Sequence, residues 1–397
     1  MRANNAAEVC EAIADANAAA VAFTVQAGGS KSALGHPSHT DRLLDVRGIA
    51  GIIDYDPAEL VLTARPGTPL AEIETLLTGS GQHLAFEPPS YATLLETQGA
   101  ATLGGTLAAN ASGPRRIAAG AARDHFLGVH AVSGRGELFK AGGRVVKNVT
   151  GYDLAKLLAG SFGTLAVMTE VTVKVLPAPE ATTTVLVRGL SHADAVRRMT
   201  EVTATSVDCS GLAHLPAGAA ARSSVTDVVA AGTSVTALRV EGIAASVKAR
   251  TAAIRGMVAG LGEGAELDQR ASHLLWREVR EVSLLPPGGV VWRLSVPPRE
   301  GAAVARAIAE RLDCEALFDW AGGLVWIALP DELPHQDVVR GAIAACGGHA
   351  TLMRAPESVR RGVAVFQPQA PALAALARRL KAAFDPAGIL NPGRMVV

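Results

Sequence analysis

The feature that most constrains this chain is a glycine-rich loop that directly follows an expected strand. The strand is the apolar run Val21–Val25, and the loop reads Gln26-Ala27-Gly28-Gly29-Ser30-Lys31-Ser32. Consecutive glycines can adopt positive φ angles and let backbone N–H groups gather around an anion such as a diphosphate. The loop lacks the G-x-G-x-x-G spacing of a Rossmann site and the G-K-S/T ending of a P-loop. Two interpretations therefore stay open here, a diphosphate-binding nest and an ordinary tight turn.

A second window, from Gly99 to Pro114, consists mainly of small residues and contains Thr102-Leu103-Gly104-Gly105. Small residues are needed where the backbone approaches a flat ring or a diphosphate closely. They are also typical of closely packed helices. The pairs Arg115-Arg116 and Arg123-Asp124 follow within a dozen positions. Charge beside a wall of small residues makes plain helix packing the less attractive interpretation.

Turn residues and polar side chains form a third candidate. The run Lys147-Asn148-Val149-Thr150-Gly151-Tyr152-Asp153-Leu154 precedes Gly160-Ser161-Phe162-Gly163-Thr164-Leu165, which leads into an expected strand at Val167. Taken singly, each of these residues is better explained as a cap or a turn.

The expected elements indicate an α+β first domain over residues 1–177. Short strands are expected at Ile52–Tyr55 and Leu60–Ala64, because β-branched and apolar residues gather there between turn residues. A helix is expected from Pro69 to Gly79, with Thr68 as its N-cap.

The end of this domain is marked by Leu165–Leu176, where valines alternate with polar residues as in a half-buried strand. Pro177 and Pro179 stop that strand. Strands and helices then recur through residues 178–365, which indicates a second, antiparallel α+β domain with a ferredoxin-like texture, and residues 366–397 form a C-terminal segment. The expected strands are 183–188, 234–241, 290–296, 316–320 and 324–329. One expected helix begins at residue 191, a second ends near residue 259, and a third spans 300–312.

Charge and hydropathy exclude two classes of function. Lys plus Arg and Asp plus Glu both number 37, so no excess of positive charge is available to bind a nucleic acid. No apolar run approaches the roughly 20 residues that span a bilayer. The Ala-rich start, Met1–Ala22, carries acidic residues and is expected to be a helix rather than a signal peptide. We therefore expect a soluble, cytoplasmic protein that reaches a membrane only through a partner.

The cysteines give no sign of a metal or cluster site. Cys10, Cys209, Cys314 and Cys346 lie far apart in the sequence and form no C-x-x-C pair. Neither a zinc ribbon nor a ferredoxin-type iron–sulfur cluster is expected, and no metal site is assigned.

Taken together, the motifs resemble those of flavoproteins of the vanillyl-alcohol oxidase type, which have a PCMH-type FAD-binding domain. The glycine loop, Ala101–Gly105, Arg123-Asp124, Gly160–Leu165 and the ending Phe384–Arg394 carry this resemblance. It covers roughly residues 20 to 179 and the C-terminal segment.

A narrower resemblance is to the FAD-binding E subunits of bacterial glycolate oxidases. It rests on Gly113–Arg116, Lys147–Leu154 and Gly347–Ala350. The resemblance implies an FAD-binding domain of two α+β subdomains, a cap domain over the isoalloxazine, and a C-terminal segment that returns to the FAD-binding domain.

The resemblance also implies positions for the cofactor. The residues that would hold the pyrophosphate are Gly28, Gly29, Ser30, Lys31 and Ser32; those along the flavin and ribityl chain are Thr102, Leu103, Gly104, Gly105, Asn110 and Gly113; those on the adenosine side are Gly163, Thr164 and Val167; and Asn391 and Arg394 would come back from the C-terminal segment.

Two departures from related flavoproteins affect the chemistry. Some relatives attach FAD through a His in the glycine loop, whereas this loop has Lys31 and the nearest histidine is His36. We therefore expect noncovalent FAD. The catalytic D subunit and its relatives carry metal-binding histidines and a His-Gly-x-Gly segment, and this sequence has no such segment.

The catalytic residues are not assigned by the sequence. His349 follows two glycines beside an expected strand, so it is a candidate general base, although a role unrelated to catalysis is the more common outcome for such a residue. The four tryptophans, Trp276, Trp292, Trp320 and Trp326, are assigned to core packing because three lie in expected strands.

The resemblance implies an FAD-binding subunit of a glycolate oxidase or dehydrogenase complex that oxidises glycolate to glyoxylate. Its expected partners are a catalytic flavoprotein subunit and an iron–sulfur subunit that accepts the electrons, with the complex peripheral on the inner membrane. Two alternatives stay open. The chain could be a self-sufficient FAD-dependent 2-hydroxyacid dehydrogenase, or a non-catalytic subunit that binds FAD for electron relay or structure.

Overall fold

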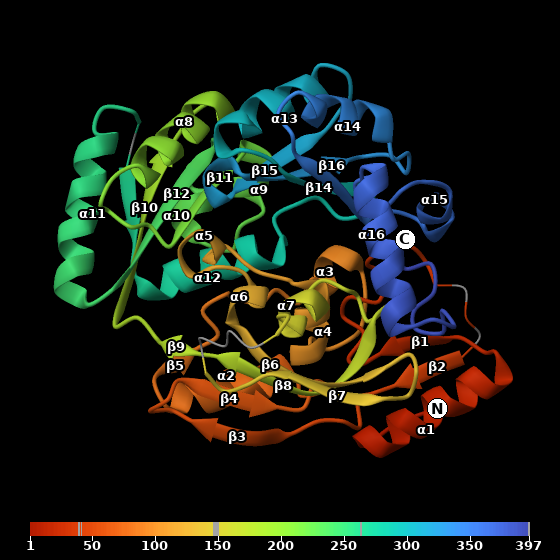
Figure 1. Cartoon of the computed structure of the whole chain (residues 1–397). Helices are drawn as coiled ribbons and strands as arrows, with labels where there is room; N and C mark the ends of the chain where they lie inside the picture. Colours follow the sequence, from red (N-terminus) through yellow and green to blue (C-terminus); the bar gives the residue numbers. More distant parts are fainter. Residues whose placement is uncertain (39, 41, 146–150, 263, 396–397) are drawn as a thin grey trace. The chain divides into compact units, whose positions relative to one another are not determined.

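A computed structural model describes residues 1–38, 40, 42–145, 151–262 and 264–395. The chain forms two compact units (Figure 1). The first comprises Met1–Ser112, Gly120–Ala178 and Pro368–Val397, and the second comprises Gly113–Ala119 and Pro179–Gln367.

The short segment Gly113–Ala119, which lies inside the first domain expected from the sequence, belongs to the second unit. Its position follows from two contacts within that unit. The Arg115 guanidinium forms a bidentate ion pair with Glu241, with N···O distances of 2.7 and 2.8 Å. The carbonyl of Gly113 accepts a hydrogen bond from Nε1 of Trp320 at 3.1 Å.

The first unit is built on an antiparallel sheet with the strand order β3-β4-β8-β6-β7. Two smaller sheets pair β1 with β2 in parallel and β5 with β9 in antiparallel orientation. The strands are β1 (Phe23–Gln26), β2 (Arg42–Asp45), β3 (Ile52–Asp56), β4 (Val61–Ala64), β5 (Gln82–His83), β6 (Phe126–Ser133), β7 (Leu138–Gly142), β8 (Ala166–Lys174) and β9 (Leu176–Pro177).

The helices of this unit make two buried cores with the sheets. In the larger core, Ile73, Leu107 and Leu158 pack with Val171 and Val173 of β8. In the smaller core, apolar residues of the N-terminal helix pack with β1, β2 and the C-terminal segment. The helices are α1 (Ala6–Ala19), α2 (Leu70–Gly79), α3 (Ala92–Leu95), α4 (Leu103–Ala109), α6 (Ala122–His125), α7 (Leu154–Leu158) and α16 (Pro371–Phe384).

The expected start of α2 is corrected by one position. Pro69 is the N-cap and Leu70 the first helical residue. Thr68 does not cap the helix because its hydroxyl has other partners: it accepts from the backbone N–H of Gly51 at 2.9 Å and donates to the carbonyl of Arg65 at 2.7 Å.

The second unit contains an eight-stranded antiparallel sheet with the order β13-β10-β12-β11-β15-β16-β14-β17. Each half of this sheet has the strand order of a ferredoxin-like β-α-β-β-α-β unit. The halves join through β11 and β15, where His214 pairs with Phe318. The strands are β10 (Ala181–Arg188), β11 (Gly211–Leu215), β12 (Val235–Gly242), β13 (Gly264–Leu267), β14 (Val290–Ser295), β15 (Glu315–Asp319), β16 (Leu324–Leu329) and β17 (His349–Arg354).

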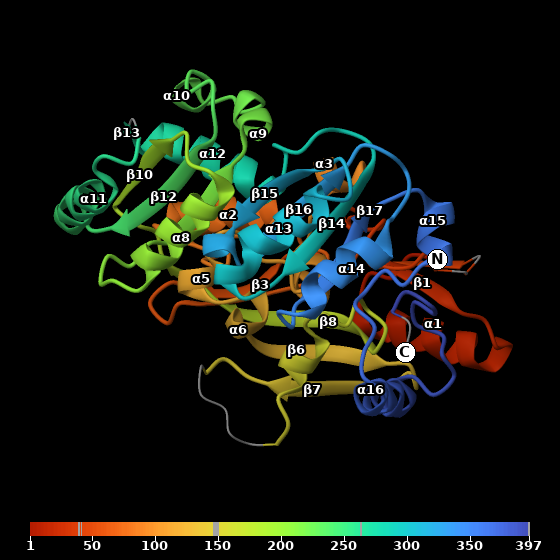
Figure 2. The same ribbon diagram turned by 90° about the horizontal axis from the view of Figure 1, so that it is seen from above.

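Four helices cover one face of the eight-stranded sheet, as Figure 2 shows for α8, α11, α13 and α14. Their apolar residues form the core with alternate residues of the strands, such as Trp292 and Leu294 of β14. The helices of the unit are α5 (Arg116–Ala119), α8 (His192–Thr203), α9 (Ala217–Ala221), α10 (Thr226–Val229), α11 (Ala244–Val258), α12 (Gln269–Glu281), α13 (Gly301–Ala309), α14 (Gln336–Ala344) and α15 (Glu357–Gly362), with the 3₁₀ turns η1 (Pro298–Glu300) and η2 (Trp320–Gly322).

Side chains alternate across a strand, so residues such as Arg293 of β14 and Arg239 of β12 lie on the sheet face opposite these helices. We call this the polar face.

In the part of the chain that the structure describes, no helix is both long and apolar enough to cross a bilayer.

Candidate cofactor site

A cavity of about 100 Å³ opens in the first unit where four distant parts of the sequence meet. A cavity of this size accommodates a diphosphate group rather than a whole dinucleotide. Its lining residues are Val25, Gln26, Ala27, Gly28, Gly29, Ser30, Lys31, Ser32, Ala100, Thr102, Gly105, Ala108, Ala109, Phe162, Asn391 and Arg394. We call this cavity the loop pocket.

The glycine loop is pressed against the small-residue window. A Cβ atom on Gly28 would lie 2.0 Å from the carbonyl oxygen of Ala100, and one on Gly99 would lie 2.1 Å from the carbonyl oxygen of Gly28. Gly29 forms a parallel bridge with Ala100 and has a φ of +83°. Gly28 and Gly99 let the two backbone segments touch. Because Gly28 and Gly29 have no side chains, this part of the loop presents its backbone to the pocket.

The adjacent glycines of α4 have different roles. A Cβ on Gly104 would lie 2.4 Å from Cβ of Pro66, so Gly104 serves packing within the unit. A Cβ on Gly105 would meet only Oγ1 of Thr102, at 3.2 Å, and Gly105 lines the pocket. Since Ala108 and Ala109 continue the same wall, this side of the pocket has room for an extended group.

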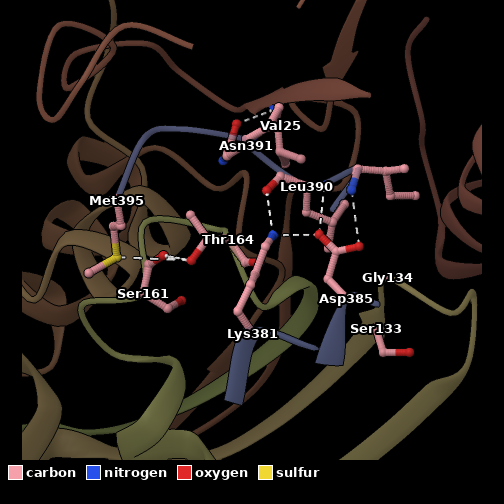
Figure 3. Close-up of polar contacts among 12 residues, drawn as sticks. Val25, Ser133, Gly134, Ser161, Thr164, Lys381, Asp385, Leu390, Asn391 and Met395 are labelled. Atoms are coloured by element: carbon pink, nitrogen blue, oxygen red, sulfur yellow. Dashed lines mark hydrogen bonds and ion pairs between the residues drawn. The ribbon is translucent and has the colours of Figure 1, made fainter. Parts of the chain in front are cut away.

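The C-terminal segment returns to the first unit, and its Asn391 connects two parts of the pocket wall. Oδ1 of Asn391 accepts from the backbone N–H of Val25 at 2.8 Å, and Nδ2 donates to the carbonyl of Phe162 at 2.8 Å. Figure 3 shows Asn391 beside Val25, at the end of the returning segment. One carboxamide therefore joins the strand before the glycine loop to the Ser161–Thr164 turn.

A buried ion pair fixes the direction of the returning segment (Figure 3). Nζ of Lys381, at the end of α16, bonds to the carboxylate of Asp385 and to the carbonyls of Thr164 and Leu390, at 2.7 and 3.0 Å for the carbonyls. The Asp385 side chain is fully buried and accepts from the backbone N–H groups of Ile389 and Leu390.

Two cationic side chains line the pocket. Nη1 of Arg394 donates to the carbonyls of Leu34 and Ser32 at 2.6 and 3.2 Å, so the guanidinium is anchored beside the loop. Nζ of Lys31 lies 5.9 Å from the centre of the Tyr91 ring. Backbone N–H groups of a glycine loop and two positive charges suit a diphosphate, and the alanine wall leaves room for it, so the residues present fit the diphosphate of FAD.

The other expected site residues lie elsewhere. Leu103, Gly104 and Val167 are buried; Leu103 belongs to the larger core and Val167 to the smaller one. Oδ1 of Asn110 accepts from the backbone N–H of Arg123, and Oγ1 of Thr164 donates to the carbonyl of Ser161.

Gly163 lies next to Asn391, and Gly113 belongs to the second unit. Lys147–Thr150 falls outside the described residues. His349, the candidate base, is exposed at the start of β17 in the second unit.

Some residues at or near the pocket are not singled out by the sequence. Gln26 and Phe162 line the pocket and lie within the quoted motifs, but the motifs give them no role. Lys381 does not line the pocket, yet it holds the returning segment, and no motif points to it. The spacing of Lys381 and Asp385, four residues apart on one helix face, was a usable signal for an ion pair. Among the described residues, no three His, Cys, Asp or Glu side chains gather as a metal site requires.

Comparison with protein families assigns both ends of the chain to flavoproteins. A family described as FAD binding domain matches residues 1–142, and a family described as FAD linked oxidases, C-terminal domain, matches residues 366–395. These ranges contain the glycine loop, α4 and the returning segment, which together line the pocket.

Individual proteins give the same assignment. The glycolate oxidase subunit GlcE of Escherichia coli strain K12 is 36% identical over 379 residues, which cover 94% of this chain and 92% of that protein. A D-lactate dehydrogenase of Anaerostipes hadrus is 33% identical over 136 residues, 34% of this chain and 27% of that enzyme.

Among solved structures, a p-cresol methylhydroxylase with substrate bound matches with a TM-score of 0.73 at 16% identity, over 100% of this chain and 88% of that chain. This likeness shows the vanillyl-alcohol oxidase type of fold that the motifs predict. The chain belongs to the family of FAD-linked oxidoreductases that includes the glycolate oxidase subunit GlcE.

Proposed function

We propose that this chain is the noncovalent FAD-binding subunit of a complex that oxidises glycolate to glyoxylate. The observation that carries the proposal is the match to GlcE along almost the whole of both chains. The loop pocket supports it, because its glycine backbone and its cations suit the diphosphate of FAD.

Bound FAD would supply the two-electron acceptor for oxidation of an alcohol carbon. The residues of the pocket would bind and orient it. Lys31 and Arg394 offset the charge of the diphosphate, Gly28 and Gly29 let it approach the backbone, and Asn391 keeps the loop and the Ser161–Thr164 turn in register.

Noncovalent attachment is proposed from the glycine loop. The loop has Lys31 where some related flavoproteins attach FAD through a histidine, and the nearest histidine in the sequence is His36. The amine of Lys31 and the guanidinium of Arg394 bind phosphate by charge instead.

The partners are proposed from what the sequence lacks. The four cysteines are spread from position 10 to position 346 without a C-x-x-C pair, so this chain does not offer the ligand set of an iron–sulfur cluster. Electrons from the flavin would pass to an iron–sulfur subunit, and a related catalytic flavoprotein would complete the complex. Cytoplasmic location, with membrane association through that complex only, is part of this proposal.

The test is to measure glycolate oxidation with an artificial acceptor for the chain alone and after co-expression with the catalytic flavoprotein and iron–sulfur subunits. We expect negligible turnover for the chain alone and activity for the complex. Turnover of the isolated chain near the roughly 10 per second typical of enzymes would instead establish a self-sufficient dehydrogenase.

A pair of variants separates an FAD role from a structural role. Gly105→Val projects into the pocket, whereas Gly256→Val in α11 projects into open space. If the complex with Gly105→Val loses this chain's FAD and its activity while Gly256→Val keeps both, the FAD serves the reaction. Unchanged activity without that FAD would assign the chain a structural role.

A further inference from the structure

The polar face of the second unit carries an arginine, Arg293, that has no ion pair with any of the residues that the structure describes. Arg293 of β14 is half-buried, with its guanidinium 5.1 Å from the centre of the Trp320 ring and 5.9 Å from that of Trp326. Trp326 is its neighbour across the β14–β16 ladder. None of the described residues gives the Arg293 guanidinium an ion pair or a side-chain hydrogen bond.

A second arginine on the same face provides an internal comparison. Arg239 also stacks on an indole, 4.4 Å from the Trp276 ring, but its Nε lies 3.3 Å from the carboxylate of Glu241. Burial by itself would raise the pKa of Glu241, yet Arg239 and Arg115 outweigh burial and hold that pKa below its ordinary value. Within the described part of the chain, Arg239 therefore has a carboxylate partner and Arg293 has none.

The indole under Arg293 is held in place at a conformational cost. Trp320 has a φ of +52° and the next residue, Ala321, a φ of +58°. Left-handed backbone is unfavourable at a bulky residue and persists where the surroundings enforce it. Here Nε1 of Trp320 donates to the carbonyl of Gly113 at 3.1 Å, and its backbone N–H donates to Asp319 at 2.7 Å.

A histidine shares the face with this arginine. In the β14–β17 ladder Arg293 pairs with Thr351, and Ser295 pairs with His349. Since alternate residues of a strand face the same side, all four side chains belong to the polar face. Arg293 and His349 are diagonal neighbours, whose backbone positions lie roughly 7–8 Å apart in an antiparallel pair. A small molecule can therefore contact both side chains.

We propose that Arg293 binds the carboxylate of a short 2-hydroxyacid and that His349 accepts a hydrogen bond from its hydroxyl group. The inference rests on the proposed function and adds where the substrate is recognised. A guanidinium binds a carboxylate through two parallel N–H···O bonds, which a single ammonium cannot reproduce.

The test uses calorimetric titration of the purified full chain with oxalate, a short dianion that cannot be oxidised as an alcohol. We expect Arg293→Gln to weaken oxalate binding about 10- to 100-fold, the range for a lost charged hydrogen bond. Arg293→Lys should give an intermediate oxalate affinity, because the ammonium group keeps the positive charge but lacks the planar pair of donors of the guanidinium. Arg197→Gln on α8, an exposed residue on the helix-covered side of the sheet, is the matched control and should bind as the wild type does.

Glycolamide and acetate separate the two contacts. Glycolamide has the hydroxyl without the negative charge, so its affinity should not respond to Arg293→Gln. Acetate has the charge without the hydroxyl, so His349→Ala should weaken glycolate binding and leave acetate binding unchanged.

Equal oxalate affinities of the wild type and Arg293→Gln, or no oxalate binding at all, would overturn this inference. The proposed function would still stand if the complex oxidised glycolate. Conversely, a complex that fails to oxidise glycolate would remove the proposed function even if oxalate bound through Arg293.

Discussion

Gly163 leaves the space that the carboxamide of Asn391 occupies. A Cβ atom on Gly163 would lie 2.9 Å from Nδ2 of Asn391, and Gly163 has a φ of +67°. This contact explains why a glycine in the Ser161–Thr164 turn and an asparagine more than two hundred residues later act on one pocket.

Replacing Gly163 by alanine should weaken FAD binding about tenfold, which corresponds to about 1.4 kcal/mol. The added methyl group pushes Asn391 away from Phe162 and from the backbone of Val25. Gly388→Ala is the matched control, since Gly388 has a φ of +66° and open space around its Cβ. Both variants carry the same backbone strain, so flavin fluorescence titration showing equal FAD affinities would contradict the role given to Asn391.

The two glycines of α4 should respond differently to substitution. Gly104→Ala should lower the melting temperature because its methyl group collides with Pro66, whereas Gly105→Val should keep the melting temperature and lose FAD affinity. Thermal unfolding and FAD titration of both variants measure the two effects separately. Wild-type flavin occupancy in Gly105→Val would assign the whole segment to packing.

How far the sequence predicts this fold depends on how local each signal is. The alternation of valines in β8 is a local signal, and the strand expected at Leu165–Leu176 lies at Ala166–Lys174. Pro177, which is expected to stop it, lies in the short separate strand β9. The role of Thr68 could not be predicted, because its hydroxyl is used by Gly51, far from the helix start.

The same reasoning applies to the sites. The sequence indicates a glycine-rich, small-residue surface, but it cannot tell Gly104 from Gly105, since Pro66 decides which of them faces the pocket. Trp320 and Trp326 are buried, as core packing predicts, yet their contact with Arg293 depends on strand pairing that no local pattern reveals.

Lys381→Met should lower the free energy of unfolding by about 3–5 kcal/mol, because it leaves the fully buried Asp385 carboxylate without its cation. Lys156→Met is the control: its pair with Asp153 is half-exposed and should contribute less than about 1 kcal/mol. Denaturant unfolding of the two variants compares them directly. Equal losses would show that the buried pair does not fix the returning segment.

Stability should fall as the pH drops below about 6.5, because of a buried histidine pair in the second unit. Burial, together with the neighbouring His192, lowers the pKa of His214 to about 3, and burial lowers the pKa of His192 as well. Between those pH values the unfolded chain binds the proton that the folded chain excludes. The free energy of unfolding should therefore decrease by up to about 1.4 kcal/mol per pH unit for His214.

The contacts of this pair give a variant for the pH experiment. Nε2 of His214 lies 3.0 Å from Nδ1 of His192, and its Nδ1 lies 2.9 Å from Oγ1 of Thr236. His214→Gln keeps a polar side chain without a titrating ring. Denaturant unfolding between pH 7 and pH 5 should show a shallower pH dependence in this variant, and an unchanged slope would place the effect elsewhere.

FAD binding in the loop pocket is tested most simply by the FAD content of the purified full chain after acid precipitation. We expect about one FAD per chain, released to the supernatant, because the loop pocket binds the diphosphate by charge and backbone contacts. Yellow colour that stays in the pellet would contradict noncovalent binding. A colourless chain that does not take up added FAD would show that the pocket is not an FAD site.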